Sequence, residues 1–195
     1  MRRIFVIRHG NTFASSAQAC RIGRRTDIPL VESGHRQAQA LGAWFAARPF
    51  AVTRLLSSPL LRARQTAQAI ADATGHGIDG IRDWLSEIDH GPDEGKPEAE
   101  VVARLGPQAI ADWDERGIAP PGWAVDADAR IAGWRAFFGE TDEGVDLLVT
   151  SNGAARFAPI AAGLPTTSLK LRTGAWGELT VEGGAVRLLR WDERP

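Results

Sequence analysis

The segment R-H-G-N-T at residues 8–12 holds the residue types that phosphoryl transfer needs. It directly follows the apolar run 4–7, which is typical of a buried strand and too short to span a membrane. The carboxyl end of such a strand is where open α/β sheets bind their ligands. A neutral imidazole at His9 beside the guanidinium of Arg8 is suited to attack a phosphoryl group, because the arginine neutralises oxygens that would repel a nucleophile. A second interpretation, in which His9 caps a strand and Arg8 is a solvated charge, fits these five residues equally well.

A second arginine is expected at the same edge of the sheet. Residues 57–67 run from a strand end through Pro59, a candidate first helical residue, into a helical pattern. Arg62 then falls in the first helical turn, close to His9. Taken alone, the segment also fits an ordinary helix with a surface arginine.

Two more segments could supply a proton donor and an anion site. Glu87 lies at the base of a Pro/Gly/Asp-rich stretch, where a partly desolvated carboxyl with a raised pKa would serve as a general acid. An apolar run ending at Thr150 delivers Asn152 and Gly153 to the start of a helix, where free backbone N–H groups attract anions. Glu87 also fits a surface carboxylate, and Asn152 also fits a helix cap.

The remaining pattern alternates strands with helices and predicts a mostly parallel sheet covered on both faces, a three-layer α-β-α sandwich. Strands are expected at 4–7, 54–57, 145–150, 177–181 and 185–190, and helices at 33–47, 60–74, 99–115, 127–138 and 154–162. The last two strands are joined through 182–184 and predict a hairpin, hence an antiparallel edge. The stretch of about 86–122 is predicted to be a lid inserted over the sheet, within a single domain spanning residues 1–195.

Composition excludes several classes of protein. The chain has 195 residues, and 23 Lys and Arg balance 24 Asp and Glu, so nothing favours nucleic acid or a membrane as a partner. Cys20 is the only cysteine, so no internal disulfide can form, which fits a reducing interior. Only four apolar residues follow Met1-Arg2-Arg3, too few for a signal peptide. We therefore expect a cytoplasmic protein.

Two glycine-rich segments resemble nucleotide-binding motifs but lack the sequence context that these motifs require. Residues 75–80 fit the dinucleotide fingerprint but follow a helix instead of a strand, so we interpret them as a helix stop and a loop. Residues 91–96 resemble a phosphate loop, yet the spacing is one residue short and Pro97 replaces the Ser or Thr that holds magnesium. The acids Asp89, Asp93 and Glu94 beside His90 are expected to be solvated loop charges, since no metal-binding spacing accompanies them.

Together these segments resemble the histidine phosphatase superfamily, whose members have the phosphoglycerate-mutase-like fold. The resemblance rests on ordered motifs that cover most of the chain: R-H-G-x-T at 8–12, T-D-x-P-L at 26–30, G-x-x-Q-A at 34–38, S-S-P-L-x-R-A-x-Q-T-A at 57–67 and L-x-E-x-D-x-G at 85–91. It implies a mixed sheet sandwiched by helices, in agreement with the pattern of strands and helices.

The resemblance also implies roles for the site residues. His9 would be the nucleophile that becomes phosphorylated, while Arg8, Arg62 and Asn11 would hold the phosphoryl oxygens. Glu87 would protonate the leaving oxygen and then accept a proton from the attacking water. Such chemistry depends on positioning and charge stabilisation, so no metal and no cofactor is expected.

The chain departs from the family pattern at three places. Asn152-Gly153 stands where the family usually has His-Gly, and an asparagine donates hydrogen bonds but stays neutral. Gly122-Trp123 stands where Gly-Glu is frequent, ahead of the helix that carries Arg130. His90 stands where an aromatic residue is common, and we hypothesise that it partly replaces the missing imidazole.

The leading hypothesis is a phosphomonoesterase that hydrolyses a small phosphorylated metabolite through a phosphohistidine. Asn152 motivates the alternative of a phospho-ligand-binding protein with weak turnover, and a mutase ranks last because the lid is short and acidic. Two interpretations stay open for Arg21, Arg24 and Arg25: contact with an anionic substrate tail, or surface charges. The tryptophans Trp84, Trp113 and Trp123 fit either an apolar wall of the site or anchors of the lid, and core packing is the preferred interpretation.

Overall fold

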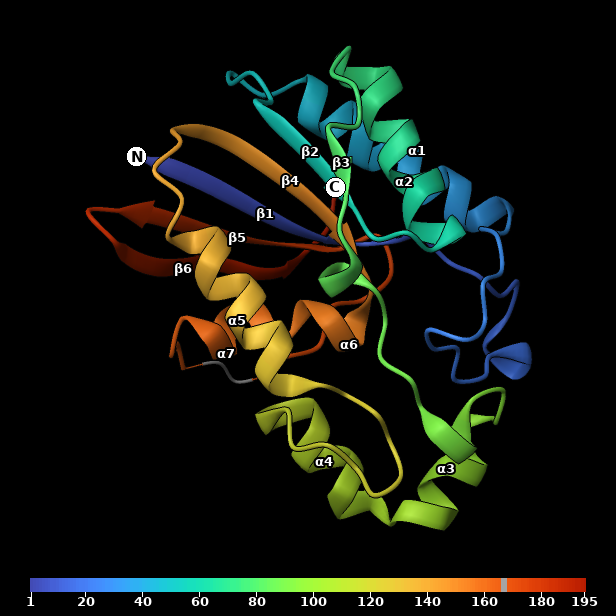
Figure 1. The fold of residues 1–195 in the computed structure, drawn as a ribbon. Coiled ribbons are helices and arrows are strands. Elements are labelled where there is room, and N and C mark those ends of the chain that lie inside the picture. Colours follow the sequence, from blue (N-terminus) through green and yellow to red (C-terminus); the bar gives the residue numbers. More distant parts are fainter. Residues whose placement is uncertain (166–167) are drawn as a thin grey trace.

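A computed structural model describes residues 1–165 and 168–195, and its centre is a six-stranded sheet with the order β3-β2-β4-β1-β5-β6 (Figure 1). The strands are β1 (Arg2–Arg8), β2 (Arg54–Ser57), β3 (Gly80–Ile81), β4 (Gly144–Thr150), β5 (Trp176–Glu182) and β6 (Ala185–Glu193). The first four strands pair in parallel, whereas β5 pairs antiparallel with both β1 and β6. The predicted mostly parallel sheet with an antiparallel edge is confirmed; the two-residue β3 was not predicted.

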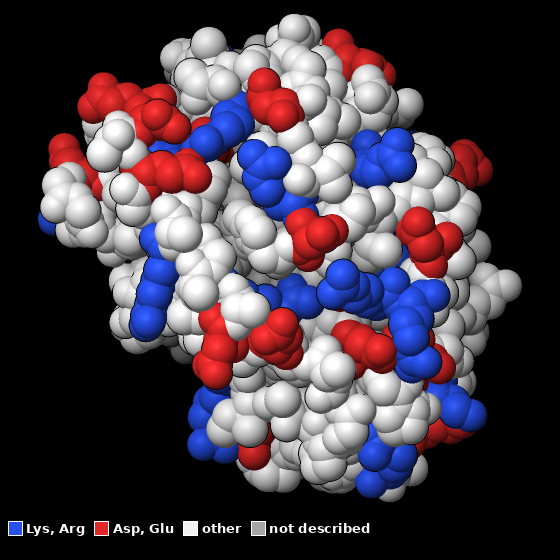
Figure 2. Space-filling view, viewed as in Figure 1, with Lys and Arg blue, Asp and Glu red and all other residues white. Residues whose placement is uncertain are grey.

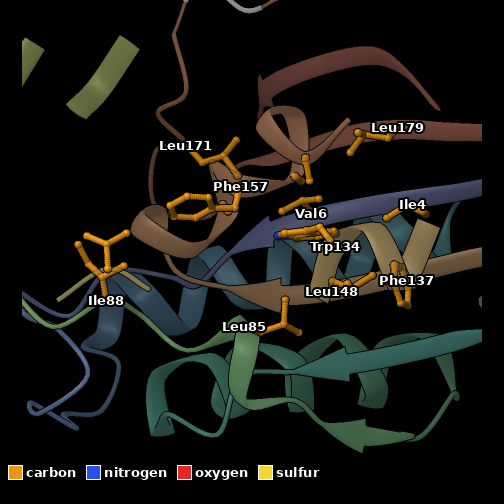
Figure 3. Packing of buried hydrophobic residues seen from close by; sticks show 14 of the residues in the cluster. Ile4, Val6, Leu85, Ile88, Trp134, Phe137, Leu148, Phe157, Leu171 and Leu179 are labelled. Carbon is orange, nitrogen blue, oxygen red and sulfur yellow. The ribbon is translucent and has the colours of Figure 1, made fainter. Parts of the chain in front are cut away.

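Helices cover both faces of this sheet. The α-helices of the described residues are α1 (Glu32–Ala46), α2 (Leu61–Thr74), α3 (Glu98–Leu105), α4 (Pro107–Arg116), α5 (Ala127–Phe138), α6 (Asn152–Ala155) and α7 (Phe157–Ala161), and all except α3 and α4 lie against the sheet (Figure 1). Side chains alternate along β1, so Phe5 and Ile7 pack with α1 and α2 on one face. Ile4 and Val6 face α5, α6 and α7 on the other, where Figure 3 shows Trp134 and Phe157 packed over them. The three layers follow from this alternation.

Proline breaks two of the predicted helices. The expected helix 99–115 is two helices, α3 and α4, separated at Gly106, which has φ +82° and precedes Pro107. The expected helix 154–162 is likewise divided into α6 and α7, where Pro159 has no N–H to donate to the Ala155 carbonyl. Pro59 is not the first helical residue, because α2 begins at Leu61 after Leu60 as N-cap.

The segment predicted as a lid carries α3 and α4, which lie at the end of the molecule away from α1 and α2 (Figure 1). It packs onto the main core through Val101, Ile110, Trp113 and Trp123, all of which are buried. The expected packing role of Trp113 and Trp123 is confirmed.

Two acidic residues of this segment differ from expectation. The Glu94 side chain is only 7% exposed and accepts a 2.7 Å hydrogen bond from Thr26 Oγ1. Asp93 is buried, not solvated: its carboxylate pairs with Arg104 and accepts a 2.6 Å hydrogen bond from Trp123 Nε1. The ion pair and the indole N–H replace the water that the carboxylate loses. No helix within residues 1–165 and 168–195 has the length and apolarity that crossing a membrane requires.

Candidate active site

His9 lies just past the carboxyl end of β1, buried in the protein. Its backbone N–H donates to the Thr150 carbonyl of the neighbouring strand, which fixes the main chain there. Its Nδ1 lies 2.8 Å from the Gly10 carbonyl oxygen. A carbonyl only accepts, so Nδ1 carries the proton and Nε2 keeps a free lone pair. Burial, together with the charges of Arg62 and Arg8, holds the pKa of His9 well below its ordinary value, so the imidazole is neutral.

Arg62, the second residue of α2, faces this lone pair. Its Nε–H lies 3.2 Å from His9 Nε2. Its other two nitrogens donate to the carbonyl oxygens of Thr26 (2.7 Å) and Gly23 (3.2 Å), so the guanidinium is held in one orientation. The placement of Arg62 beside His9, predicted from the helix start, is confirmed.

Arg8 and Asn152 are joined through the backbone of a single residue, Leu171. Arg8 Nη1 donates to the Leu171 carbonyl (2.6 Å), and Asn152 Oδ1 accepts from the Leu171 N–H (2.8 Å). Burial lowers the pKa of Arg8 to about 10, which still leaves the guanidinium charged at neutral pH. Because the amide oxygen of Asn152 is occupied, its Nδ2 is left as a donor. Asn152 is not a helix cap: Ser151 is the N-cap of α6, and Asn152 is the first helical residue.

Glu87 is buried, and both of its carboxylate oxygens accept backbone hydrogen bonds. Oε1 accepts from the Ile88 N–H (2.9 Å) and Oε2 from the Gly153 N–H (3.2 Å). Burial acts to raise the pKa of Glu87, but His90, the two N–H groups and Arg62 outweigh it, so that the pKa is lowered. The expectation of a raised pKa is therefore wrong for the protein alone, because the carboxylate receives more hydrogen bonds and positive charge than its burial removes.

Gly153 has a different partner from the one predicted. Its N–H was expected to bind an anion of the substrate, and instead it binds the carboxylate of Glu87. A Cβ on Gly153 would lie 2.1 Å from Glu87 Oε1, so this close approach requires glycine.

His90 lies in the same region and packs edge-on against Trp123, with the ring centroids 4.6 Å apart. The ring is buried, and its Nδ1 has no hydrogen-bond partner. Burial lowers the pKa of His90, so this second imidazole is also neutral at pH 7.

Most of these residues line one cavity of about 570 Å³, although they come from widely separated segments. Arg62 is fully buried behind His9 and is not among the lining residues. The predicted residues that line it are Arg8, His9, Asn11, Arg21, Glu87, His90, Asn152 and Gly153. Asn11 is held by its neighbours, since its Nδ2 donates to Ser33 Oγ (3.2 Å) and its Oδ1 accepts from Thr173. Arg24 and Arg25 are exposed and do not line the cavity. Within the described part of the chain, no cluster of three or more His, Cys, Asp or Glu residues is arranged to hold a metal ion.

Several supporting residues were missed from the sequence, although they lie within its motifs. Thr66 Oγ1 accepts from the Gly10 N–H (3.2 Å), and Gln37 Oε1 accepts from the Asn11 N–H (2.8 Å), so both hold the loop after β1. Asp27 Oδ1 accepts from the Leu61 N–H (2.7 Å) at the start of the helix that carries the second arginine. Each of these three residues is a named position of the motif that contains it, at 26–30, 34–38 or 57–67, and that was the available signal.

A buried arginine was missed as well. Arg130 on α5 donates to the carbonyl oxygens of Val125 (2.7 Å) and Ser86 (2.6 Å), and to that of Glu87 (3.4 Å). These bonds tie the segment before the acid to α5 and hold the carboxylate in place.

Comparison with known proteins supports the assignment suggested by this geometry. The profile of the histidine phosphatase superfamily (branch 1) matches residues 4–194. The chain belongs to the histidine phosphatase superfamily. The resemblance that the motifs suggested is thereby confirmed, and with it the family fold.

Individual relatives of this histidine phosphatase superfamily member include both mutases and phosphatases. The 2,3-bisphosphoglycerate-dependent phosphoglycerate mutase 2 of Gloeobacter violaceus is 30% identical over 161 residues, 78% of this chain and 71% of that protein. The uncharacterized phosphatase PhoE of Bacillus subtilis is 35% identical over 104 residues, 53% of this chain and 51% of that protein.

Solved structures of mycobacterial proteins share the whole fold. Mycobacterial hydrolase 1 has a TM-score of 0.82 at 25% identity and covers 100% of this chain and 99% of its own. Mycobacterial glucosyl-3-phosphoglycerate phosphatase has a TM-score of 0.79 at 24% identity, with 98% and 99% covered.

Proposed function

We propose that the protein is a phosphomonoesterase that hydrolyses a small phosphorylated metabolite through a phosphohistidine at His9. The observation that carries the proposal is the neutral, buried imidazole of His9, whose Nδ1–H is held by a carbonyl and whose Nε2 lone pair faces Arg62. A fixed nucleophile next to two guanidinium groups suits phosphoryl transfer, which depends on positioning and charge stabilisation.

In the first step, the His9 Nε2 lone pair forms a bond to phosphorus while the bond from phosphorus to the ester oxygen breaks. The phosphoryl oxygens take hydrogen bonds from Arg62, Arg8 and the Asn152 amide, which frees Nε2 from its contact with Arg62. Glu87, in its protonated form, gives a proton to the departing oxygen, so that an alcohol leaves.

In the second step, water attacks phosphorus and the bond between phosphorus and Nε2 breaks. The carboxylate of Glu87 accepts a proton from this water, which regenerates the neutral imidazole and releases inorganic phosphate. The two backbone N–H groups on Glu87 keep the carboxylate in one place through both steps.

Glu87 has a lowered pKa in the protein alone, so the proton for the first step is taken up when the substrate binds. A phosphate dianion next to the carboxylate raises that pKa, and a monoanionic ester brings the proton itself. The complex of enzyme and substrate holds the same number of protons by either route.

One specific observation favours a second function, a phospho-ligand-binding protein with slow turnover. Where the family usually has a second histidine, Asn152 offers one neutral donor. Replacing it, in Asn152→His, tests this directly: a large gain in turnover would mean that the natural chain is tuned to bind, not to hydrolyse. A mutase remains the third alternative, and a product carrying a moved phosphate would establish it.

The proposal is tested by phosphate release from a panel of sugar phosphates, phosphoglycerates, nucleotides and an aryl phosphate, with a metal chelator present. We expect release by the wild type, loss of release in His9→Ala, and no loss in His35→Ala, an exposed histidine on α1 outside the cavity. A phosphorylated protein trapped by rapid quenching should be absent from His9→Ala alone. Full activity of His9→Ala would eliminate the phosphohistidine mechanism.

A further inference from the structure

The outer part of the cavity differs in character from the end that holds His9. Its wall combines polar side chains, such as Ser15, Ser16 and Thr173, with apolar ones, which are Phe13, Ala14, Ala19, Cys20, Ile22 and Trp113. The volume of about 570 Å³ is large enough for a leaving group of many atoms in addition to the phosphoryl group. The leaving group of a substrate bound at His9 would therefore lie against this wall.

Two basic side chains reach the outer wall, and each is paired with a carboxylate. Arg21 makes a bidentate pair with Glu98, with Nε 2.8 Å from Oε2 and Nη2 2.6 Å from Oε1. Lys170 Nζ lies 2.7 Å from Asp114 Oδ2. Among the described lining residues, the only other Lys or Arg is Arg8, at the phosphoryl end.

The pair of Arg21 with Glu98 is built into the backbone. The Arg21 N–H donates to the Lys96 carbonyl (2.9 Å), and the Gly95 N–H donates to the Arg21 carbonyl (2.7 Å). This short ladder holds the loop after β1 against the start of α3, and Figure 1 shows the two segments side by side. Arg21 also lies over the ring of Trp123, with 4.9 Å from its guanidinium carbon to the ring centroid. The guanidinium is thus ordered before any substrate binds.

Figure 2 shows that basic side chains cross the middle of one face of the molecule with acidic side chains beside them. The Arg21 side chain is only 15% exposed, whereas that of Glu98 is 56% exposed. The carboxylate therefore covers the guanidinium from the solvent side, where an anionic group on a substrate would otherwise bind.

We propose that Glu98, by occupying Arg21, makes this site select phosphate monoesters whose leaving group carries no negative charge. A carboxylate on the leaving group would face Glu98 without a free cation, and this like-charge contact disfavours it. Glu98 is a specificity-determining residue in this proposal, and it takes no part in the chemistry. The inference rests on the proposed phosphatase function.

A matched substrate pair tests it: phenyl phosphate against 4-carboxyphenyl phosphate, each followed by release of inorganic phosphate. In the wild type we expect kcat/KM to be at least about tenfold higher for phenyl phosphate, the factor that corresponds to about 1.4 kcal/mol. In Glu98→Gln, kcat/KM for the carboxylated ester should rise until the preference disappears, while that for phenyl phosphate stays the same.

Two control variants test whether the substrate preference depends on the pair of Arg21 with Glu98. Glu100→Gln removes an exposed carboxylate from the same helix, one that pairs with Lys96 and does not line the cavity, and it should leave the preference unchanged. Adding Arg21→Gln to Glu98→Gln should abolish the gain on the carboxylated ester, because that gain requires a free guanidinium.

The outcomes separate this inference from the function on which it rests. If phenyl phosphate is hydrolysed in a His9-dependent way but both esters react equally in the wild type and in Glu98→Gln, only the inference is overturned. If neither ester is hydrolysed, the proposed function fails, and calorimetry with phenylphosphonate and 4-carboxyphenylphosphonate still decides the selectivity. Equal affinity of the wild type for the two phosphonates would then overturn the role of Glu98.

Discussion

The substitution Asn152→Asp isolates what the amide at this position contributes. Asn152 uses its oxygen to accept the Leu171 N–H at 2.8 Å and leaves its nitrogen as a donor at the cavity. Aspartate has nearly the same shape and keeps the acceptor, so the bond to Leu171 survives. The donor is replaced by an oxygen that cannot donate to a phosphoryl oxygen when ionised.

The size of the effect follows from this geometry. Removing one preorganised donor from a transition-state site lowers kcat about 100- to 1000-fold. The negative charge of the new side chain adds repulsion toward the phosphoryl group, so we expect the loss to be at least about 100-fold. Thermal unfolding should change little, since the buried Leu171 N–H keeps its partner.

Asn152→Ala provides the comparison. It removes the same donor, but it also leaves the Leu171 N–H without an acceptor, which costs about 1–3 kcal/mol of folding stability. Because the Leu171 carbonyl holds Arg8, we expect the alanine variant to lose both activity and stability. The assay is kcat on the best substrate of the panel, with the melting temperature of each variant measured in parallel. An aspartate variant with wild-type kcat would refute the reasoning, because the amide nitrogen would then play no part in the transition state.

Three further predictions concern the acid. In Gly153→Ala, a Cβ 2.1 Å from Glu87 Oε1 displaces the carboxyl group, so kcat should fall about 100-fold or more while the protein still folds; unchanged kcat would mean that Glu87 is not the proton donor. In the free protein Glu87 is ionised and His9 is neutral, so the reactive substrate is the monoanionic ester. We therefore expect kcat/KM to fall about tenfold per pH unit above the second phosphate pKa of the substrate, which is about 6. A pH-rate profile that is flat from about pH 6 to 8 would contradict this. His90→Phe keeps the packing on Trp123 and removes the imidazole beside the acid, so kcat should fall by about 10-fold or more, whereas an unchanged rate in a stable variant would assign His90 to packing alone.

Much of the fold could be predicted because its signals are local. The apolar run at residues 4–7 defines β1, and the alternation of strands with helices along the chain predicts a sheet covered on both faces, as found. The positions of His9 at a strand end and of Arg62 in the first turn of a helix follow from the same local rules. Both residues therefore reach the carboxyl edge of the sheet, as expected.

Electrostatics could not be predicted, because it depends on groups that are distant in sequence. The pKa of Glu87 was expected to be raised from its setting near a lid, but Gly153, 66 residues away, donates to its carboxylate. Asp93 was expected to be solvated, whereas Arg104 and Trp123 make its burial favourable.

The sequence by itself determined the family, the sheet and the residue types of the site, because motifs and periodicity record the local conformation of each segment. Only the tertiary structure decided which hydrogen bonds each of these residues makes: Asn152 with Leu171, Gly153 with Glu87, and Arg21 with Glu98. The physical reason is that charge state and donor orientation depend on the nearest neighbours in space, and these neighbours are brought together only when the sheet and its loops have closed around the cavity.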